Sequence, residues 1–431
     1  MINSPDARST RKPLKIVPVA ILILVLSFLV VPLTSVQADQ VLTNGRIVNS
    51  AMAVDNAGDI LVVGSTAGFG RGQAMALLLK YDPSGKLLCL KTIGPETTVV
   101  DTFGYGVTFD SSNNIYVTGG TQSFDGQRFH VFLQKFDSSC NFVYQVAWGG
   151  LGNDVGRAVT VDALDNVYVT GYTGSYGSGQ LNVFLLKYDA AGEFQFSKIW
   201  GGAQNDYGNG VAADGSGNIY VTGVANNFTK QMIFLLKYDS LGNLLLQRTW
   251  GGIQNDYASG IIVDPANNVY ITGYTFSAGV TQGVASVLLL KYDSSGNLLF
   301  QKTWGGKLND YGSGLTMDSA GNVYVTGYTY SSSITPGVAS VLVLKYDQSG
   351  NLLLQRIWGG RRSDYGYAIA VDPGANIYVT GYTYSFGIAQ NPQGFQNPNT
   401  QGPYVFLLKY DAMGDLLVQK TYGGGTPDIS P

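Results

Sequence analysis

The chain has 431 residues, of which 57 are glycine, 28 are tyrosine and only 13% are charged. A hydrophobic content of 45% excludes a disordered chain, and a formal net charge of −3 argues against binding to a phosphate backbone, which needs clustered Lys and Arg. The abundance of glycine and tyrosine is typical of an all-β protein with many tight turns.

Residues 1–38 predict an export segment. A basic stretch that ends at Lys15 is followed by an apolar run from Ile16 to Val36, and small residues at Val36 and Ala38 fit a signal-peptidase site. The favoured prediction is a cleaved signal peptide. An uncleaved membrane anchor stays open, because about 20 apolar residues are enough to span a bilayer. In either case the rest of the chain is expected outside the cytoplasm, secreted or at the cell surface.

Seven copies of one sequence block follow. The block reads NVYVTGYT with small changes, and its central glycine recurs every 50 to 55 residues. These glycines are Gly64, Gly119, Gly171, Gly223, Gly273, Gly327 and Gly381. Self-similarity at such a period is the signature of a repeat architecture.

Two further blocks keep the same step along the chain. An apolar run ends in Lys-aromatic-Asp, with its lysines at Lys80, Lys135, Lys187, Lys237, Lys291, Lys345 and Lys409. A WGG block begins at Trp148, Trp200, Trp250, Trp304 and Trp358, while Ile93 and Tyr422 take the Trp position in the first and last copies. We interpret the tryptophans as packing residues.

Each copy predicts four strands, here called A to D. In the fourth copy these are residues 208–214, 218–223, 233–238 and 244–250, and the A–B and C–D links read Asp-x-x-Gly-Asn, which is hairpin turn chemistry. Four-stranded units with two apolar faces must stack on neighbours, so we predict an all-β, seven-bladed β-propeller over residues 39–431. The expected blades are 41–93, 94–148, 149–200, 201–250, 251–304, 305–358 and 359–422. A tail at 423–431 is expected to dock on the first blade and close the ring.

At NIYVTGYT, KYDxxGN and WGGxxNDYG the chain resembles the SBBP repeat family, which forms seven-bladed β-propellers in exported bacterial and archaeal proteins. The resemblance covers about residues 41–428. It implies the fold and an extracytoplasmic location, and it implies no particular activity.

The two cysteines, Cys89 and Cys140, fall in an outer strand of one blade and in a turn of the next. Two isolated thiols are the favoured interpretation. A disulfide stays open, because an exported protein meets an oxidising environment.

Variable loops are the best pointer to a binding surface. The hairpin links are short and uniform, whereas the B–C loops at residues 65–76, 172–182 and 382–404 vary in length and sequence. Tyrosines gather there and could contact sugars or extended peptides, although packing between blades is the competing interpretation. The first set follows the strand B glycine and the second set lies further into the loops: Tyr172, Tyr274, Tyr328 and Tyr382, then Tyr176, Tyr330 and Tyr384.

A recurring aspartate follows each WGG block. The set comprises Asp154, Asp206, Asp256, Asp310 and Asp364, with Asp101 and Asp428 as looser matches. A ring of carboxylates could hold a cation such as Ca²⁺, but their presence in every repeat favours a structural role. No other cofactor is expected. The single histidine, His130, is placed in a surface loop and cannot form a histidine metal site alone.

These features predict an exported, non-enzymatic scaffold that binds a cell-surface polysaccharide or protein through its B–C loops. The alternatives are an extracellular lyase or hydrolase with an Asp- and Tyr-lined central funnel, or a purely structural envelope component. We expect a monomer that binds no nucleic acid and meets the membrane only through an uncleaved N-terminal segment.

Overall fold

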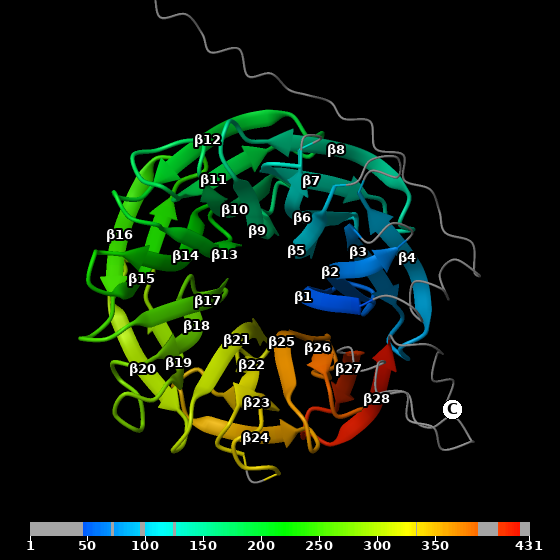
Figure 1. Cartoon of the computed structure of the whole chain (residues 1–431), viewed down its shortest axis with the longest axis vertical. Coiled ribbons are helices and arrows are strands. Elements are labelled where there is room, and N and C mark those ends of the chain that lie inside the picture. The colour runs from blue at the N-terminus through cyan, green and yellow to red at the C-terminus, as the bar shows by residue number, and fades with distance from the viewer. Residues whose placement is uncertain are drawn as a thin grey trace, which may run out of the picture.

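The computed structural model describes residues 46–69, 73–94, 100–123, 126–332, 334–386 and 404–422. These residues form seven four-stranded antiparallel sheets around a central axis, which confirms the predicted β-propeller (Figure 1). The N-terminal segment 1–38 and the tail 423–431 lie outside the described residues. Among the described residues there is no helix long and apolar enough to cross a membrane.

Each sheet is built from four consecutive strands, with strand A innermost and strand D outermost (Figure 1). Blades one to three comprise β1 (Arg46–Val54), β2 (Ile60–Phe69), β3 (Gln73–Tyr81), β4 (Leu87–Ile93), β5 (Thr102–Phe109), β6 (Ile115–Gln122), β7 (Phe129–Phe136), β8 (Phe142–Trp148), β9 (Asp154–Val161), β10 (Val167–Thr173), β11 (Asn182–Tyr188) and β12 (Phe194–Trp200). Blades four and five comprise β13 (Tyr207–Ala213), β14 (Ile219–Asn226), β15 (Gln231–Tyr238), β16 (Leu244–Trp250), β17 (Asp256–Val263), β18 (Val269–Thr275), β19 (Ser286–Tyr292) and β20 (Leu298–Trp304). Blades six and seven comprise β21 (Asp310–Met317), β22 (Val323–Thr329), β23 (Ser340–Tyr346), β24 (Leu352–Trp358), β25 (Asp364–Val371), β26 (Ile377–Thr383), β27 (Tyr404–Tyr410) and β28 (Leu416–Tyr422).

The hairpin turns follow from the Asp-x-x-Gly-Asn pattern. In the C–D turn of blade four, the Asp239 carboxylate accepts backbone N–H bonds from Leu241 at 3.0 Å and Asn243 at 2.8 Å. The Asn243 side chain also donates to this carboxylate, and these bonds lower the pKa of Asp239. Gly242 has φ +78°, a conformation that strongly favours glycine. The A–B and C–D turns define one face of the ring, the hairpin face.

The repeated strand B glycine faces a bulge in strand A. In blade five, Gly273 lies opposite Ala258, and the register shifts between Ala258 and Gly260. A Cβ atom on Gly273 would lie 1.9 Å from the carbonyl oxygen of Tyr257. The close approach of two backbones therefore explains why every copy carries glycine in this column.

Apolar side chains fill every interface between neighbouring blades. The seven clusters of buried residues each draw on two adjacent blades. One of them joins Tyr378 and Leu407 of blade seven to Ile60 and Leu77 of blade one. The ring is therefore closed by direct packing between the last blade and the first.

The lysine of the Lys-aromatic-Asp block bonds to a turn carbonyl of the next blade at six of the seven joints. Lys187 donates to the carbonyl oxygen of Ser240 at 2.9 Å, across the joint between blades three and four. At the closing joint, Lys409 donates to Pro83 at 2.9 Å and Lys420 donates to Gly85 at 2.8 Å. Polar bonds therefore support the same closure as the apolar cluster.

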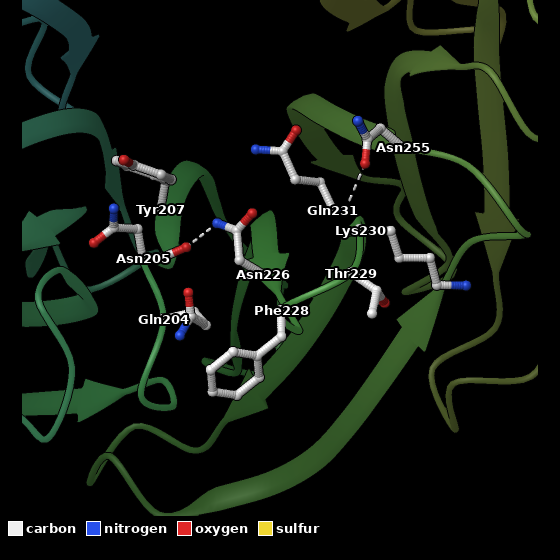
Figure 2. Close-up of a pocket in the computed structure, with 9 residues that line it drawn as sticks. All are labelled: Gln204, Asn205, Tyr207, Asn226, Phe228, Thr229, Lys230, Gln231 and Asn255. Carbon is white, nitrogen blue, oxygen red and sulfur yellow. Dashed lines mark hydrogen bonds between the residues drawn. The ribbon is translucent and has the colours of Figure 1, made fainter.

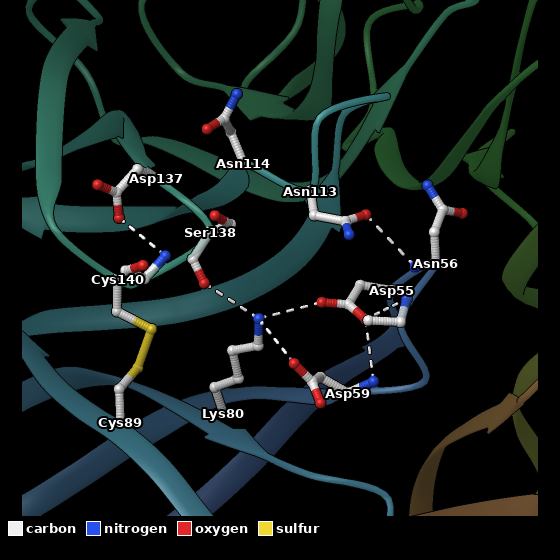
Figure 3. Close-up of polar contacts among 12 residues, drawn as sticks. Asp55, Asn56, Asp59, Lys80, Cys89, Asn113, Asn114, Asp137, Ser138 and Cys140 are labelled. Carbon is white, nitrogen blue, oxygen red and sulfur yellow. Dashed lines mark hydrogen bonds and ion pairs between the residues drawn. A yellow bond between two sulfur atoms is a disulfide. The ribbon is translucent and has the colours of Figure 1, made fainter.

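Cys89 and Cys140 form a disulfide between β4 and the β7–β8 turn, so the favoured interpretation of two isolated thiols is wrong (Figure 3). The third residue of strand D packs on the turn glycine of the next blade, as Leu246 does at Gly296. Cys89 and Cys140 occupy these two contacting columns, and Cys140 has φ +64° in the turn position. Beside them, Lys80 pairs with Asp55 at 3.1 Å.

We expect loss of this disulfide to lower the free energy of unfolding by about 2 to 4 kcal/mol, because the bond closes a loop of about 50 residues in the unfolded chain. Denaturant unfolding with and without a reductant measures the change. A double variant with the residues of another joint, Cys89→Leu with Cys140→Gly, should be insensitive to the reductant. Equal unfolding midpoints for the oxidised and reduced wild-type chain would contradict the expectation.

Candidate functional site

The B–C and D–A connections define the second face, the loop face, where an arc of aromatic rings runs along the inner strands. Tyr274 lies 4.5 Å from Tyr257 on the same blade and 4.8 Å from Tyr311 on the next, between ring centroids. Tyr328 repeats this arrangement, at 4.9 Å from both Tyr311 and Tyr365. The arc thus joins blades five, six and seven.

The arc ends at blade seven, where Tyr367 donates a hydrogen bond of 3.2 Å to the hydroxyl of Tyr382. Burial raises the pKa of Tyr274, Tyr328 and Tyr382 above the ordinary value, so their hydroxyls are neutral at physiological pH. These rings are only partly buried. They pack between blades, as the competing interpretation states, and they leave part of their surface on the loop face.

The three predicted loop tyrosines do not form one set. Tyr330 and Tyr384 extend the arc, at 6.1 Å from Tyr328 and 5.7 Å from Tyr382 respectively. Tyr176 instead packs on Trp148 at 5.0 Å and donates to the carbonyl oxygen of Gly149. Tyr176 lies two residues further into its loop than the other two, so it reaches the WGG joint and not the arc.

Two predicted loop positions are in fact strand. Most of residues 65–76 belongs to β2 and β3, which remain paired as far out as Ala67 opposite Ala74. His130 lies in β7, paired with Thr121, and not in a loop. The long B–C segment of blade seven lies largely in residues 387–403, outside the described part of the chain.

The repeated joint aspartates are buried in separate blades. Asp256 accepts hydrogen bonds from Thr275, from Ser277 at 2.8 Å and from the backbone N–H of Gly252 at 2.9 Å. Equivalent bonds hold three of the others: Asp154, Asp310 and Asp364. Each carboxylate thereby ties its D–A connection to its own B–C loop. Among the described residues no group of three metal-ligating side chains is close enough to hold an ion.

The two looser matches to the repeated aspartate, Asp101 and Asp428, differ from the five joint aspartates. Thr102 occupies the joint position in blade two, paired with Thr121 as Asp256 is with Thr275. Asp101 lies one residue earlier and accepts the backbone N–H of Ala74 at 2.8 Å. Asp428 lies outside the described residues.

Blade four breaks the repeat on the loop face. Val224 and Ala225 stand where blade five has Tyr274 and Thr275. The joint carboxylate of Asp206 keeps the bond from the backbone N–H of Gly202 at 2.7 Å, and in place of the threonine hydroxyl it accepts the backbone N–H of Asn226 at 2.9 Å. Because the tyrosine ring and threonine hydroxyl found in blades three, five, six and seven are missing, the surface is hollowed at this blade.

Two adjoining cavities of about 340 Å³ and 280 Å³ form this hollow, which we call the blade-four groove. Figure 2 shows the residues that line the larger, outer cavity. Tyr207 and Gln231 line both cavities. The outer cavity adds the amides of Gln204, Asn205, Asn226 and Asn255, together with Phe228, Thr229 and Lys230. The inner cavity adds Arg157, Asn209, Val224, Tyr257, Ala258, Ser259 and Tyr274, and so meets the aromatic arc.

Arg157 marks the inner end of the groove. Its guanidinium lies over the rings of Tyr172 and Tyr207, at 5.1 and 5.4 Å from their centroids, and donates to Asn209 at 2.6 Å. The equivalent column of strand A holds a different residue in most blades: Tyr105, Arg157, Asn209, Ser259, Ser313 and Tyr367. The site residues predicted from the sequence did not include this column. Its variation among copies of DYGSG was the signal that could have identified it.

Phe228 forms the outer lip of the groove. Its side chain is 81% exposed, and its backbone has φ +66°, which costs a non-glycine residue about 1 to 2 kcal/mol. The loop is closed by a bond from the N–H of Asn227 to the carbonyl oxygen of Lys230 at 3.1 Å. The exposed ring therefore lies on a strained turn and lines the outer cavity.

Comparisons with known proteins bear on the fold. A family model described as the SBBP β-propeller repeat matches residues 98–125, 195–228, 250–278, 304–334 and 356–387. A periplasmic gluconolactonase of Pseudomonas aeruginosa, PpgL, superposes with a TM-score of 0.52 at 12% identity, over 86% of this chain and 97% of that one. A puromycin hydrolase gives 0.52 at 12% identity, over 93% of this chain and 57% of its own. No curated protein sequence matches the chain. At this identity the two enzymes show the propeller fold alone.

Proposed function

The chain belongs to the SBBP family of β-propeller repeat proteins, and on that premise we propose that it is an exported, non-enzymatic protein that binds a cell-surface polysaccharide through its loop face. The observation that carries the proposal is the blade-four groove. It lies where blade four lacks the Tyr-Thr pair that follows the strand B glycine in blades three, five, six and seven. A position that departs from the repeat is not needed for the packing of the blades, so it is free to contact a ligand.

The lining of the groove suits sugars. Amide side chains such as Gln204 and Gln231 offer both donors and acceptors, which is what ring hydroxyls need. The rings of Tyr207 and Tyr257 offer apolar faces with a polar edge. The adjoining aromatic arc continues the same chemistry across three more blades, so an extended chain of sugars could make contacts beyond the groove.

Binding is favoured over catalysis by the state of the carboxylates. A lyase or hydrolase of the predicted kind would use an aspartate with access to the substrate. The joint aspartates of the described residues, such as Asp206 and Asp256, are buried and already accept several hydrogen bonds. The enzymes of similar fold lend no activity to this chain at 12% identity.

Two features support export. The basic and apolar segment at residues 1–38 has the pattern of a signal peptide or anchor. The disulfide between Cys89 and Cys140 is the kind of bond that persists in oxidising compartments.

Restoring the repeat should close the groove. In Val224→Tyr, the new ring would pair with Tyr207 as Tyr274 pairs with Tyr257, and would fill the inner cavity. We expect at least tenfold weaker retention of the purified full chain on immobilised polysaccharides, with an unchanged unfolding midpoint. Leu241→Tyr, on an exposed turn of the hairpin face, is the matched control.

Three results would oppose the proposal. Binding by Val224→Tyr equal to wild type would place the ligand elsewhere. Release of new reducing ends from any bound polysaccharide would support the enzyme alternative. A wild-type chain that is retained by no polysaccharide but captures one envelope protein would replace the sugar ligand with a protein.

A further inference from the structure

The hairpin face carries both acidic and basic side chains, whereas exposed acidic side chains are scarce on the described part of the loop face. Aspartates of the A–B and C–D turns, such as Asp239 and Asp293, line the hairpin face, whereas the joint aspartates of the loop face are buried. Apart from the half-buried Asp101, which accepts the backbone N–H of Ala74, the charged side chains that reach the surface of the described loop face are basic. They are Arg128, Arg157, Lys230, Lys307, Arg361 and Arg362.

These basic groups have no acidic partner among the described residues. The ion pairs of the described chain lie at the hairpin face, as between Lys135 and Asp110 at 3.3 Å, or beside it, as between Arg356 and Asp415 at 3.9 Å. Lys307, Arg361 and Arg362 are exposed. Cations without counter-charges on one face of a protein with net charge −3 create a local positive field.

The positions of these basic residues in the repeat show that they are not needed to hold the blades together. Lys307 and Arg361 stand where other blades have Leu151, Ala203 and Ile253 at the first residue after WGG. The frame accepts apolar residues at this position, so it does not need a cation there. The basic groups are therefore additions to blades six and seven, next to the aromatic arc.

Arg157 shows how one of these basic side chains could bind an anionic group. Its guanidinium is held over Tyr172 and Tyr207 and fixed by Asn209, which leaves donors of a rigid planar fork beside the inner cavity. This planar fork matches carboxylate, sulfate and phosphate oxygens better than a flexible ammonium does. Lys230 supplies a second cation at the outer cavity of the same groove, where its ammonium donates to the carbonyl oxygen of Gly252 and keeps further N–H donors.

From these observations we propose that the ligand is an anionic polysaccharide, which lies in the blade-four groove and extends over the aromatic arc to the basic connections of blades six and seven. The inference rests on the proposed function and adds the chemical class of the polymer. Arg157 and Lys230 would bind its acidic groups in the groove, and Lys307, Arg361 and Arg362 would bind those further along.

Polymers with the same backbone and different charge test the proposal. The full chain should bind polygalacturonate at least tenfold more tightly than its methyl ester, and the affinity should fall as salt is raised from 50 to about 500 mM, because ion pairs with an exposed polymer are screened. Chondroitin sulfate and a phosphate-bearing teichoic acid, run in parallel, distinguish carboxylate from sulfate and phosphate.

Charge variants locate the site. Arg157→Gln, and the double variant Arg361→Gln with Arg362→Gln, should each weaken binding to the acidic polymer by about tenfold. Lys198→Gln with Lys302→Gln removes two charges from outer strands and should have no effect. An equal loss in this control, or equal affinity for polygalacturonate and its methyl ester, overturns the inference. Equal affinity for the two polymers would leave the proposed function intact, whereas a chain that binds no polysaccharide would contradict the proposed function itself.

Discussion

Gly273→Ala should destabilise the propeller by about 5 kcal/mol or more, the largest effect expected of any single substitution considered. A Cβ atom at this position would lie 1.9 Å from the carbonyl oxygen of Tyr257, and that oxygen belongs to the backbone of the neighbouring strand. The overlap cannot be relieved by a side-chain rotation, so β17 and β18 would have to separate. Losses of this size are reserved for a few severe mechanisms, and backbone collision is one of them.

Denaturant unfolding of the purified chain, or the yield of folded protein where the variant fails to accumulate, measures this loss. Gly215→Ala is the matched control, because a Cβ atom there would meet no atom within 4 Å. We expect the control to change the free energy of unfolding by less than about 1 kcal/mol. A Gly273→Ala chain as stable as the control would show that the column is glycine for another reason.

Asp256→Ala should cost about 4 to 5 kcal/mol. The carboxylate is fully buried and accepts bonds from Thr275, Ser277 and the N–H of Gly252. Its removal leaves three donors without an acceptor in a site closed to water, and each such donor costs about 1 to 3 kcal/mol. The D–A connection and the B–C loop of blade five would lose the group that joins them.

Two further variants separate this cost from a general effect of charge. Asp256→Asn keeps the shape and one acceptor, so we expect a smaller loss of about 2 kcal/mol. Asp415→Ala removes a carboxylate that is 76% exposed and 3.9 Å from Arg356, and should cost less than about 1 kcal/mol. Equal unfolding curves for Asp256→Ala and Asp415→Ala would assign the joint aspartates no structural role.

The fold could be predicted because the copies agree with one another. Every copy repeats the same turn, the same glycine and the same lysine, and each of these has a local physical cause, such as the bulge opposite Gly273 or the bond from Lys187 to Ser240. Contacts between neighbouring copies were harder to predict from the sequence. The disulfide was missed because Cys89 and Cys140 meet only when strand D of one blade is laid over the turn of the next.

The candidate site could be predicted less well, because the residues that recur in every copy are mostly those that hold the blades together. Tyr274 and Tyr328 recur and do lie on the loop face, although they pack between blades. Val224 and Arg157 define the groove, and both are departures from the repeat. A column in which the copies differ carries more functional information than one in which they agree, and the sequence contains such a column in strand A.

The seam between blades seven and one has a consequence for biogenesis. Lys409, Tyr378 and Leu407 belong to blade seven, which is synthesised after the other six blades. Until blade seven is made, the apolar side of blade one around Ile60 and Leu77 lacks its packing partners. A chain that leaves its ribosome or export channel amino end first must therefore expose the apolar side of blade one to solvent while blades two to six are being made. Such a polypeptide has reason to depend on a holding chaperone while it is translocated, and its maturation completes only when the final hairpin docks.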